Sequence, residues 1–348
     1  MVETEVAPRG MNERPTLVAV AERAGVSIAT VSKVVNGIES GVSAATRAKV
    51  RAAIEELGYR PNRMGRSLRK LRRFTVGLAV VDPSPRFLAD PFTTNLVAGL
   101  SNHLSARGYG LLLHGVSPGT LSDSLLIREA EVDALCLNLS GTRAERVEAI
   151  RMASGLGQPL VIIQDKPVPD VTDVLFVRQA DEAGAAALAE TLMVRRPRRA
   201  VMITADVPWP AVEHRISGVA SVFSREGVRL DVIGCDETRS DAISSALESY
   251  LDTNEPPDLV VGQNDQIAII ALQVLAGRGL KVPQDVGVSG FNAFQFTGLP
   301  VPALATVRSR AYELGETAAS AILDRLETGR FRTVDHVLPL EVIAGQSV

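Results

Sequence analysis

Apolar side chains recur at helical spacing in two short segments near the beginning of the chain, residues 17–24 and 28–36. This spacing predicts two amphipathic helices. Gly25 separates them, and glycine is the residue that most readily ends a helix in a left-handed conformation. Ser27 stands where the second helix needs an N-cap. Two short helices joined by a tight glycine turn predict a helix-turn-helix, in which the second helix can lie in the DNA major groove.

The next segments extend this pattern. A third helix is predicted over residues 44–57, between a Ser43 N-cap and the helix-ending Gly58. Residues 62–69 could form two further helical turns, but helices this short are marginal in water and Gly65 weakens this one further. We therefore expect residues 62–69 to become helical only with a partner. An ordinary helical hairpin has the same apolar spacing as a helix-turn-helix, so the pattern alone leaves both interpretations open.

From Phe74 onward, apolar runs typical of strands alternate with helical patterns. The predicted strands are TVGLAVV, GLLLH, ALCLNL and LVII, and then AVMIT, LDVIGC, LVVG and VGVSGF. The predicted helices are 94–107, 121–131, 144–156, 181–194, 212–226, 241–251 and 265–278. Continuous apolar strands joined by helices indicate parallel sheets covered on both faces. Two successive units predict two lobes, with a cleft at the carboxyl ends of their strands.

Composition limits the class of protein. The chain has 348 residues, of which 46% are hydrophobic, enough for several folded domains. No apolar run approaches the roughly 18 residues of a membrane span, and the polar first residues do not form a signal peptide. Cys136 and Cys235 each lie alone in an apolar run. We therefore expect two buried thiols and a reducing, cytoplasmic location.

Charge is distributed unevenly along the chain. Residues 15–73 carry 12 Lys and Arg against four Asp and Glu, whereas residues 74–348 carry 23 against 33. The basic excess therefore coincides with the predicted helix-turn-helix. A basic segment on an acidic body indicates that only one end of the chain contacts a polyanion such as DNA.

The residues around the helix-turn-helix identify a family. VAERAGVS, TVSKVVN, VSAATRAKV, ELGYRPN and RMGRSL follow one another almost without interruption between Thr16 and Leu68. They closely resemble the beginning of LacI/GalR-type bacterial transcription repressors, and the rest of the chain is similar more loosely. The resemblance implies an α/β protein with a lambda-repressor-like helix-turn-helix head, a hinge helix, and a two-lobed periplasmic-binding-protein-like core of parallel sheets flanked by helices.

The same resemblance implies domain boundaries. A disordered tail would occupy residues 1–14, the helix-turn-helix domain 15–60, and the hinge helix with its linker 61–73. The first lobe would consist of 74–177 and 304–329, and the second of 178–303 and 330–348. In this scheme the strand ATVR and the helix 311–328 return to the first lobe.

Residues for DNA recognition follow from the second helix and from the resemblance. Ile28, Ala29 and Lys33 are expected to read bases, by apolar contacts to thymine methyls and by donation from lysine to guanine O6 or N7. Leu68 matches the side chain that wedges into the minor groove in the family, and packing in a linker is the alternative. The residues expected to contact the DNA backbone are Thr16, Ser27, Thr30, Ser32, Asn36, Tyr59, Asn62 and Arg63.

The resemblance also implies a small-molecule effector in the cleft. The residues expected to bind it are Asp82, Phe92, Gln164, Trp209, Arg215, Asn264, Asp265 and Asn292. Gln164 and Asn292 stand where the family often has aspartate, so a neutral amide that also donates replaces a charged acceptor. A sugar, a sugar acid or a related metabolite therefore remain candidates. Trp209 could stack on a sugar ring or simply anchor its loop.

These features predict a cytoplasmic, homodimeric repressor of a palindromic double-stranded DNA operator, because two helix-turn-helix heads reading half-sites require a two-fold axis. We expect no cofactor, no metal and no membrane partner. The stretch 115–119 matches the G-x-S-x-G elbow of hydrolases, but Pro118 lacks the N–H that such an elbow uses, so we expect no enzyme. The alternative is a small-ligand-binding protein whose head does not sense a ligand or mediates interactions only.

Overall fold

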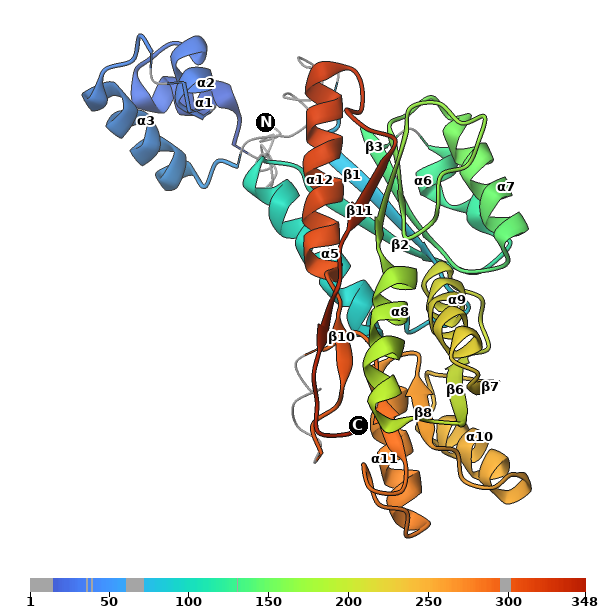
Figure 1. Ribbon diagram of the computed structural model, residues 1–348. Coiled ribbons are helices and arrows are strands. Elements are labelled where there is room, and N and C mark those ends of the chain that lie inside the picture. The colour runs from blue at the N-terminus through green and yellow to red at the C-terminus, as the bar shows by residue number, and fades with distance from the viewer. Residues whose placement is uncertain (1–14, 36, 39, 61–71, 130, 295–301) are drawn as a thin grey trace, which may run out of the picture. The chain divides into compact units, whose positions relative to one another are not determined.

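The computed structural model describes residues 15–35, 37–38, 40–60, 72–129, 131–294 and 302–348. The chain divides into two compact units, Met1–Arg73 and Phe74–Val348, which we call the head and the body (Figure 1). The predicted hinge, with Asn62, Arg63 and Leu68, lies outside the described residues, as do Asn36 and the predicted tail. No helix in the described ranges has the length and apolar character that a membrane span requires.

The head contains the three predicted helices. They are α1 (Leu17–Ala24), α2 (Ile28–Val35) and α3 (Ala44–Leu57). Gly25 ends α1 in the left-handed region at φ 63°, and the Ser27 hydroxyl accepts a hydrogen bond from the Thr30 N–H at 3.2 Å. Val20, Val31 and Val50, one from each helix, are fully buried and hold the three helices together. The predicted helix-turn-helix is therefore confirmed.

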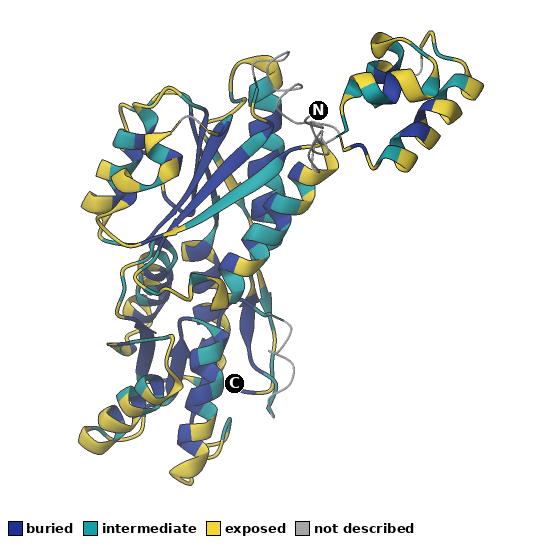
Figure 2. Cartoon of the chain, turned by 180° about the vertical axis from the view of Figure 1, so that it is seen from behind, coloured by how far each residue is buried: buried dark blue, intermediate teal, exposed yellow. Residues whose placement is uncertain are grey.

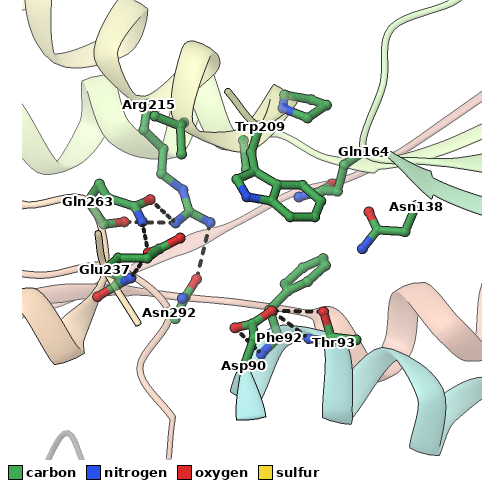
Figure 3. Close-up of a pocket in the computed structure, with 14 residues that line it drawn as sticks. Asp90, Phe92, Thr93, Asn138, Gln164, Trp209, Arg215, Glu237, Gln263 and Asn292 are labelled. Carbon is green, nitrogen blue, oxygen red and sulfur yellow. Dashed lines mark hydrogen bonds between the residues drawn. The ribbon is translucent and has the colours of Figure 1, made fainter. Parts of the chain in front are cut away.

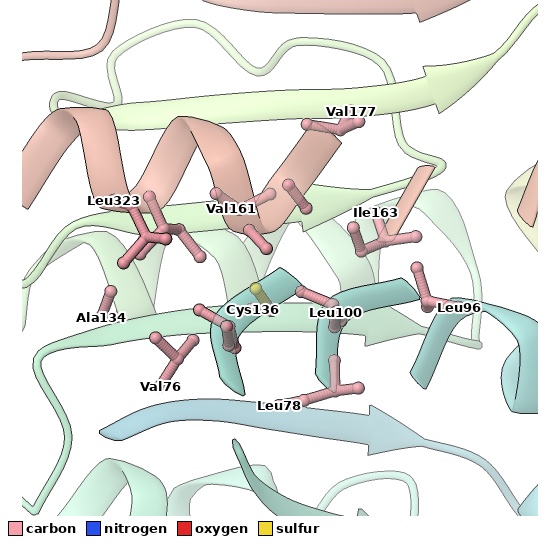
Figure 4. Close-up of a cluster of buried hydrophobic side chains, with 14 of the residues drawn as sticks. Val76, Leu78, Leu96, Leu100, Ala134, Cys136, Val161, Ile163, Val177 and Leu323 are labelled. Carbon is pink, nitrogen blue, oxygen red and sulfur yellow. The ribbon is translucent and has the colours of Figure 1, made fainter. Parts of the chain in front are cut away.

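The first lobe of the body is built on a six-stranded parallel sheet in the order β11-β5-β4-β3-β1-β2. Its strands are β1 (Thr75–Val81), β2 (Gly110–Val116), β3 (Ala134–Leu139), β4 (Leu160–Ile163), β5 (Val174–Gln179) and β11 (Asp335–Leu338). Helices α5 (Pro91–Ala106) and α12 (Ala311–Thr328) cover one face (Figure 4), and α6 (Leu125–Arg128) with α7 (Arg143–Ser154) covers the other. Most strand residues are consequently buried on both faces (Figure 2).

The second lobe has a four-stranded parallel sheet in the order β7-β6-β8-β9. Its strands are β6 (Arg199–Ala205), β7 (Arg229–Cys235), β8 (Leu259–Gly262) and β9 (Gly287–Ser289). Helices α8 (Asp181–Leu192) and α9 (Pro210–Arg225) pack on one face, and α10 (Ser240–Thr253) and α11 (Asp265–Gly277) on the other. Cys136 and Cys235 are both free and buried, as predicted. Burial raises the pKa of the Cys136 thiol to about 12, so it stays protonated and unreactive.

The last part of the chain corrects the predicted lobe boundaries. β11 pairs with β5 in the first lobe, so residues 330–348 do not all belong to the second. The predicted strand ATVR contains β10 (Thr306–Arg308), which pairs antiparallel with β12 (Glu341–Ile343). Val307 and Val342 of this pair pack into the core of the second lobe rather than the first. The chain therefore crosses between the lobes after β5, after β10 and after β11.

Two further predictions differ from the structure. The helix predicted over 121–131 is broken into a 3₁₀ turn, η2 (Leu121–Asp123), and the single turn of α6, because Ser124 adopts an extended conformation and caps α6. β5 was not predicted, since the polar residues Arg178 and Gln179 end its apolar run. Two other 3₁₀ turns complete the described elements, η1 (Phe87–Ala89) and η3 (Met193–Arg195).

Glycines allow α5 and α12 to pack closely. A Cβ atom on Gly99 would lie 2.0 Å from the Tyr312 carbonyl oxygen, and one on Gly315 would lie 2.3 Å from the Leu96 carbonyl oxygen. Both obstacles are backbone atoms, which cannot rotate away as the end of a side chain can. Neither position therefore tolerates a side chain without displacement of a whole helix.

We predict that Gly99→Ala lowers the free energy of unfolding of the body by about 2–3 kcal/mol, because overpacking forces the two helices apart. Urea unfolding of the full chain measures this. Gly277→Ala is the matched control, since it lies in helix α11 with open space around the added methyl group. Equal stability of the two variants would contradict the close helix contact.

Candidate functional site

A pocket of about 540 Å³, including its open mouth, lies between the two lobes of the body (Figure 3). Clefts between two lobes are common places for small ligands. The first lobe contributes Asp90, Phe92, Thr93, Asn138 and Gln164, and the second contributes Trp209, Pro210, Ala211, Val212, Arg215, Glu237, Gln263, Asn264 and Asn292. Many of these residues come at or just after the carboxyl ends of parallel strands, where α/β sheets place ligands.

Arg215, on α9, is the cation of the pocket wall. Most of the hydrogen-bond donors of its guanidinium group already have partners within the protein. Its Nε donates to Asp181 Oδ1 at 2.9 Å, Nη1 to the Gln263 carbonyl oxygen at 2.8 Å, and Nη2 to Asn292 Oδ1 at 3.1 Å. The guanidinium also lies 3.9 Å from the ring centroid of Phe291. Arg215 therefore positions Asn292 and Gln263, and Asp181 balances its charge.

Gln164 is held in the same network from the first lobe. Its Nε2 donates to Asp181 Oδ2 at 2.9 Å, and its Oε1 accepts from the Gln179 N–H at 2.8 Å. One buried carboxylate thus binds Arg215 of the second lobe and Gln164 of the first. The amide that replaces the expected aspartate has a structural partner for each of its polar atoms.

Glu237 forms an acidic part of the pocket wall just after β7. Its Oε2 accepts hydrogen bonds from Asn264 Nδ2 at 2.6 Å and from Gln263 Nε2. Burial raises the pKa of Glu237 to about 7, and the negative charge of Asp90 adds to this rise, whereas Arg215 opposes it. The carboxyl group therefore changes its charge near neutral pH.

Aromatic side chains enclose the space next to these polar groups. Asp90 caps α5, accepting from the Phe92 and Thr93 N–H groups at 3.1 and 3.0 Å, and this turn directs Phe92 into the pocket. Figure 3 shows the Phe92 ring facing the Trp209 indole across the pocket, with the amide of Asn138 at its edge. The two rings provide apolar faces for a flat or ring-shaped ligand.

Six of the eight predicted effector residues line the pocket: Phe92, Gln164, Trp209, Arg215, Asn264 and Asn292. The other two do not. Asp82 accepts a hydrogen bond from the Ser84 N–H at 2.7 Å, while Asp265 is 1% exposed and accepts from Thr306 Oγ1 at 2.6 Å. Asn138, Glu237 and Gln263 also line the pocket but were not among the predicted residues. Their only signal was a position at or just beyond the carboxyl end of a predicted strand.

A second buried cation connects the lobes beside the pocket. Arg146, on α7 of the first lobe, is 1% exposed. Its Nε donates to Asp165 Oδ2 at 2.8 Å within the same lobe, and its Nη2 donates to Glu213 Oε2 at 2.8 Å on α9 of the second lobe. The Gly141 N–H also donates to the Pro208 carbonyl oxygen at 2.8 Å. The lobes are thus joined by a charged pair and a backbone hydrogen bond at this edge.

In the head, α2 presents the residues predicted to read bases. Ile28 is 50% exposed, Ala29 and Lys33 are exposed as well, and Val31 on the opposite side is fully buried. Thr16 and Ser27 are exposed helix caps, and Thr30 and Ser32 are half-buried. Tyr59, by contrast, is buried, and its contact with the DNA backbone stays a prediction. It is 6% exposed and packs in the core of the head, so the structure gives its ring a packing role.

We predict that Arg146→Met lowers the free energy of unfolding by about 1–3 kcal/mol, because the buried Asp165 would keep only Arg143 as its ionic partner and Glu213 would lose Arg146. Urea unfolding is again the measurement. Arg225→Met is the control, because Arg225 forms its ion pairs with Glu190 and Glu226 at the surface and its loss should change stability little. Similar losses in both variants would show that burial does not decide the strength of the Arg146 pairs.

Comparison with known proteins agrees with this organisation. Residues 16–62 match bacterial regulatory proteins of the lacI family, and residues 176–348 match the periplasmic binding protein-like domain. The HTH-type transcriptional regulator CelR of Thermobifida fusca is 29% identical over 343 residues, which cover 96% of this chain and 98% of CelR. The HTH-type transcriptional repressor CytR of Escherichia coli is 26% identical, with 94% of each chain covered.

Solved structures show the same architecture. A complex of the transcriptional regulator CelR with cellobiose has a TM-score of 0.69 at 29% identity, covering 96% of this chain and all of that chain. The lac repressor dimer bound to operator and the anti-inducer ONPF has a TM-score of 0.81 at 23% identity, covering 96% and 99%, and supports the fold alone. The helix-turn-helix head, the two-lobed body and these similarities establish that the chain belongs to the lacI family of bacterial regulatory proteins.

Proposed function

We propose that this protein is a transcriptional repressor that binds a palindromic DNA operator as a homodimer in the cytoplasm, and that a small molecule in the pocket controls this binding. The observation that carries the proposal is the exposed face of α2, formed by Ile28, Ala29 and Lys33 on a helix-turn-helix. The pocket between the lobes of the same chain supplies the place for an effector.

The proposed DNA contacts divide into two classes. Lys33 donates to guanine O6 or N7, and Ile28 and Ala29 make apolar contacts to the groove, which gives sequence preference. The caps Thr16 and Ser27 lie at helix N-termini, where hydroxyl and N–H groups contact phosphates and fix the position of the head. The net positive charge of residues 15–73 supports binding to any DNA sequence.

Control by a ligand follows from the position of the pocket. A molecule that contacts Phe92 of the first lobe and Trp209 of the second stabilises one spacing of the lobes. The segment 62–69, with Leu68 proposed as a minor-groove wedge, connects the first lobe to the head. The ligand therefore changes operator affinity only if the two lobe arrangements differ in how well this segment can become helical on DNA.

The names of the relatives suggest the class of effector. The solved CelR structure is a complex with cellobiose, and the ribose operon repressor of Bacillus subtilis is 28% identical to this chain, with 88% of the chain covered. Cellobiose and ribose belong to the names of those relatives. For this chain we propose a compact molecule with several hydroxyl groups, placed between the rings of Trp209 and Phe92.

Base readout is tested first by selecting operators from random duplexes with the full chain. We expect one palindromic sequence to emerge, and Lys33→Ala to bind it at least about 30-fold more weakly, because the homodimer would lose about 1–3 kcal/mol at each of its two half-sites. Lys49→Ala, exposed on α3, is the control and should leave the base preference unchanged. Equal affinity of the unaltered protein for every duplex at moderate salt would overturn the proposal.

Ligand control is tested by thermal unfolding with sugars, sugar acids and nucleosides. We expect at least one compound to raise Tm, because it binds the folded state. That compound should change the affinity of the protein for its operator by a certain factor. Linkage requires that the operator change the affinity of the protein for the compound by the same factor. No effect of any compound on Tm would instead favour the alternative, a regulator that does not sense a ligand.

A further inference from the structure

The charges around the pocket do not balance. Arg215 is paired with the buried Asp181, so its charge is already compensated within the protein. The remaining ionisable side chains of the pocket wall are Asp90 and Glu237, both acids. Asp82, at the end of β1, adds a third negative charge close enough to act on Glu237. The described residues therefore present a ligand with a wall of net negative charge.

We propose that the ligand of this pocket is a hydroxylated molecule bearing a protonated amine, and that Glu237, together with Asp90, selects it over neutral and anionic analogues. The inference rests on the proposed function, because it takes the pocket to be the effector site. It narrows the effector class to amines of the amino sugar type and disfavours sugar acids.

The bonding of Glu237 leaves one oxygen for the ligand. Both amide groups that reach this carboxylate, those of Gln263 and Asn264, donate to Oε2. Among the described residues no hydrogen bond is donated to Oε1. A ligand ammonium group at Oε1 would form a charge-assisted hydrogen bond, which is stronger than a bond between neutral groups.

The charged groups around Glu237 do not neutralise the negative charge of this part of the pocket. Asp90 from the beginning of α5 and Asp82 from the end of β1 both raise its pKa, and Arg215 from α9 is the cation that lowers it. The pKa of about 7 shows that Arg215 does not offset burial and the two acids. A positive charge on the ligand would supply the missing compensation.

Asn138 independently indicates that the pocket holds a polar ligand. The residue is 3% exposed, and its side chain forms no hydrogen bond to any other described residue. Its amide is directed into the pocket beside Trp209 and Phe92 (Figure 3). Buried amides usually have partners, so a ligand hydroxyl is the fitting partner here. The aromatic faces of Trp209 and Phe92 also attract a cation.

The ionisation of Glu237 makes the binding of an amine depend on pH. Glu237 must be ionised to pair with an ammonium group, and it becomes ionised as the pH rises through about 7. Affinity for the amine should therefore rise as the pH increases from about 6 to 7. At higher pH it should fall again, because the ammonium group of a 2-amino sugar also loses its proton close to neutral pH. A ligand that accepts a hydrogen bond from the protonated carboxyl group would show the opposite trend.

The experiment compares three matched series by titration calorimetry with the full chain. The probes are D-glucosamine, D-galactosamine and D-mannosamine, each with its parent hexose and the corresponding aldonic acid. We expect at least one amine to bind about 10- to 100-fold more tightly than its parent hexose, the range for a hydrogen bond to a charged group, and the acid to bind weakest. Stronger binding of a hexose or an acid than of its amine, or no binding of any amine, overturns the proposal.

Variants assign the effect to Glu237. Glu237→Gln keeps the shape of the side chain and removes its charge, so the advantage of the amine and the rise with pH should both disappear. Glu148→Gln, exposed on α7, should retain both. Retention of the amine preference in Glu237→Gln contradicts the assignment. Operator selection without any sugar tests the proposed function separately, so a protein that selects an operator but binds no amine disproves only the ligand class.

Discussion

The carboxylate of Asp181 joins the two lobes by binding two residues of the pocket wall, and the arrangement of the site depends on it. It accepts Arg215 on one oxygen and Gln164 on the other, at 1% exposure. A buried carboxylate without such partners would cost several kcal/mol. Because Arg215 is needed for this pairing, its charge is not available to a ligand. The ligand instead meets Asp90 and Glu237, and the pocket is acidic although an arginine lies in its wall.

A second consequence concerns motion between the lobes. Arg146 and Glu213 connect the lobes beside the pocket, whereas three chain segments cross between them elsewhere. The Ala180 N–H donates to the Leu338 carbonyl oxygen at 2.9 Å, and Ser309 Oγ donates to Gln179 Oε1 at 2.9 Å, so the three crossings hold one another. Relative movement of the lobes therefore bends the three crossings together. The ion pair between Arg146 and Glu213 must then break, or its side chains must move with the lobes.

The sequence predicted elements well where local chemistry determines them. Helix 311–328, the glycine that ends α1 and the cap Ser43 agree with the structure because periodicity and capping are local properties. β11 was missed because a short, partly exposed edge strand resembles a polar tail until its partner β5 is known. Glu237 was missed for a similar reason. Its significance comes from Asp90 and Gln263, which lie far away in sequence and meet it only through the order of the strands.

The route of β11 also affects how the chain can fold during synthesis. β5 is complete once residue 179 has been made, but the strand that covers its edge begins only at Asp335. Ser347, fully buried in the second lobe, arrives later still and donates to the Val288 carbonyl oxygen at 2.6 Å. A nascent chain on the ribosome thus carries an open sheet edge while most of the second lobe is translated. Such an edge can pair with other strands, which makes chaperone protection valuable in this interval.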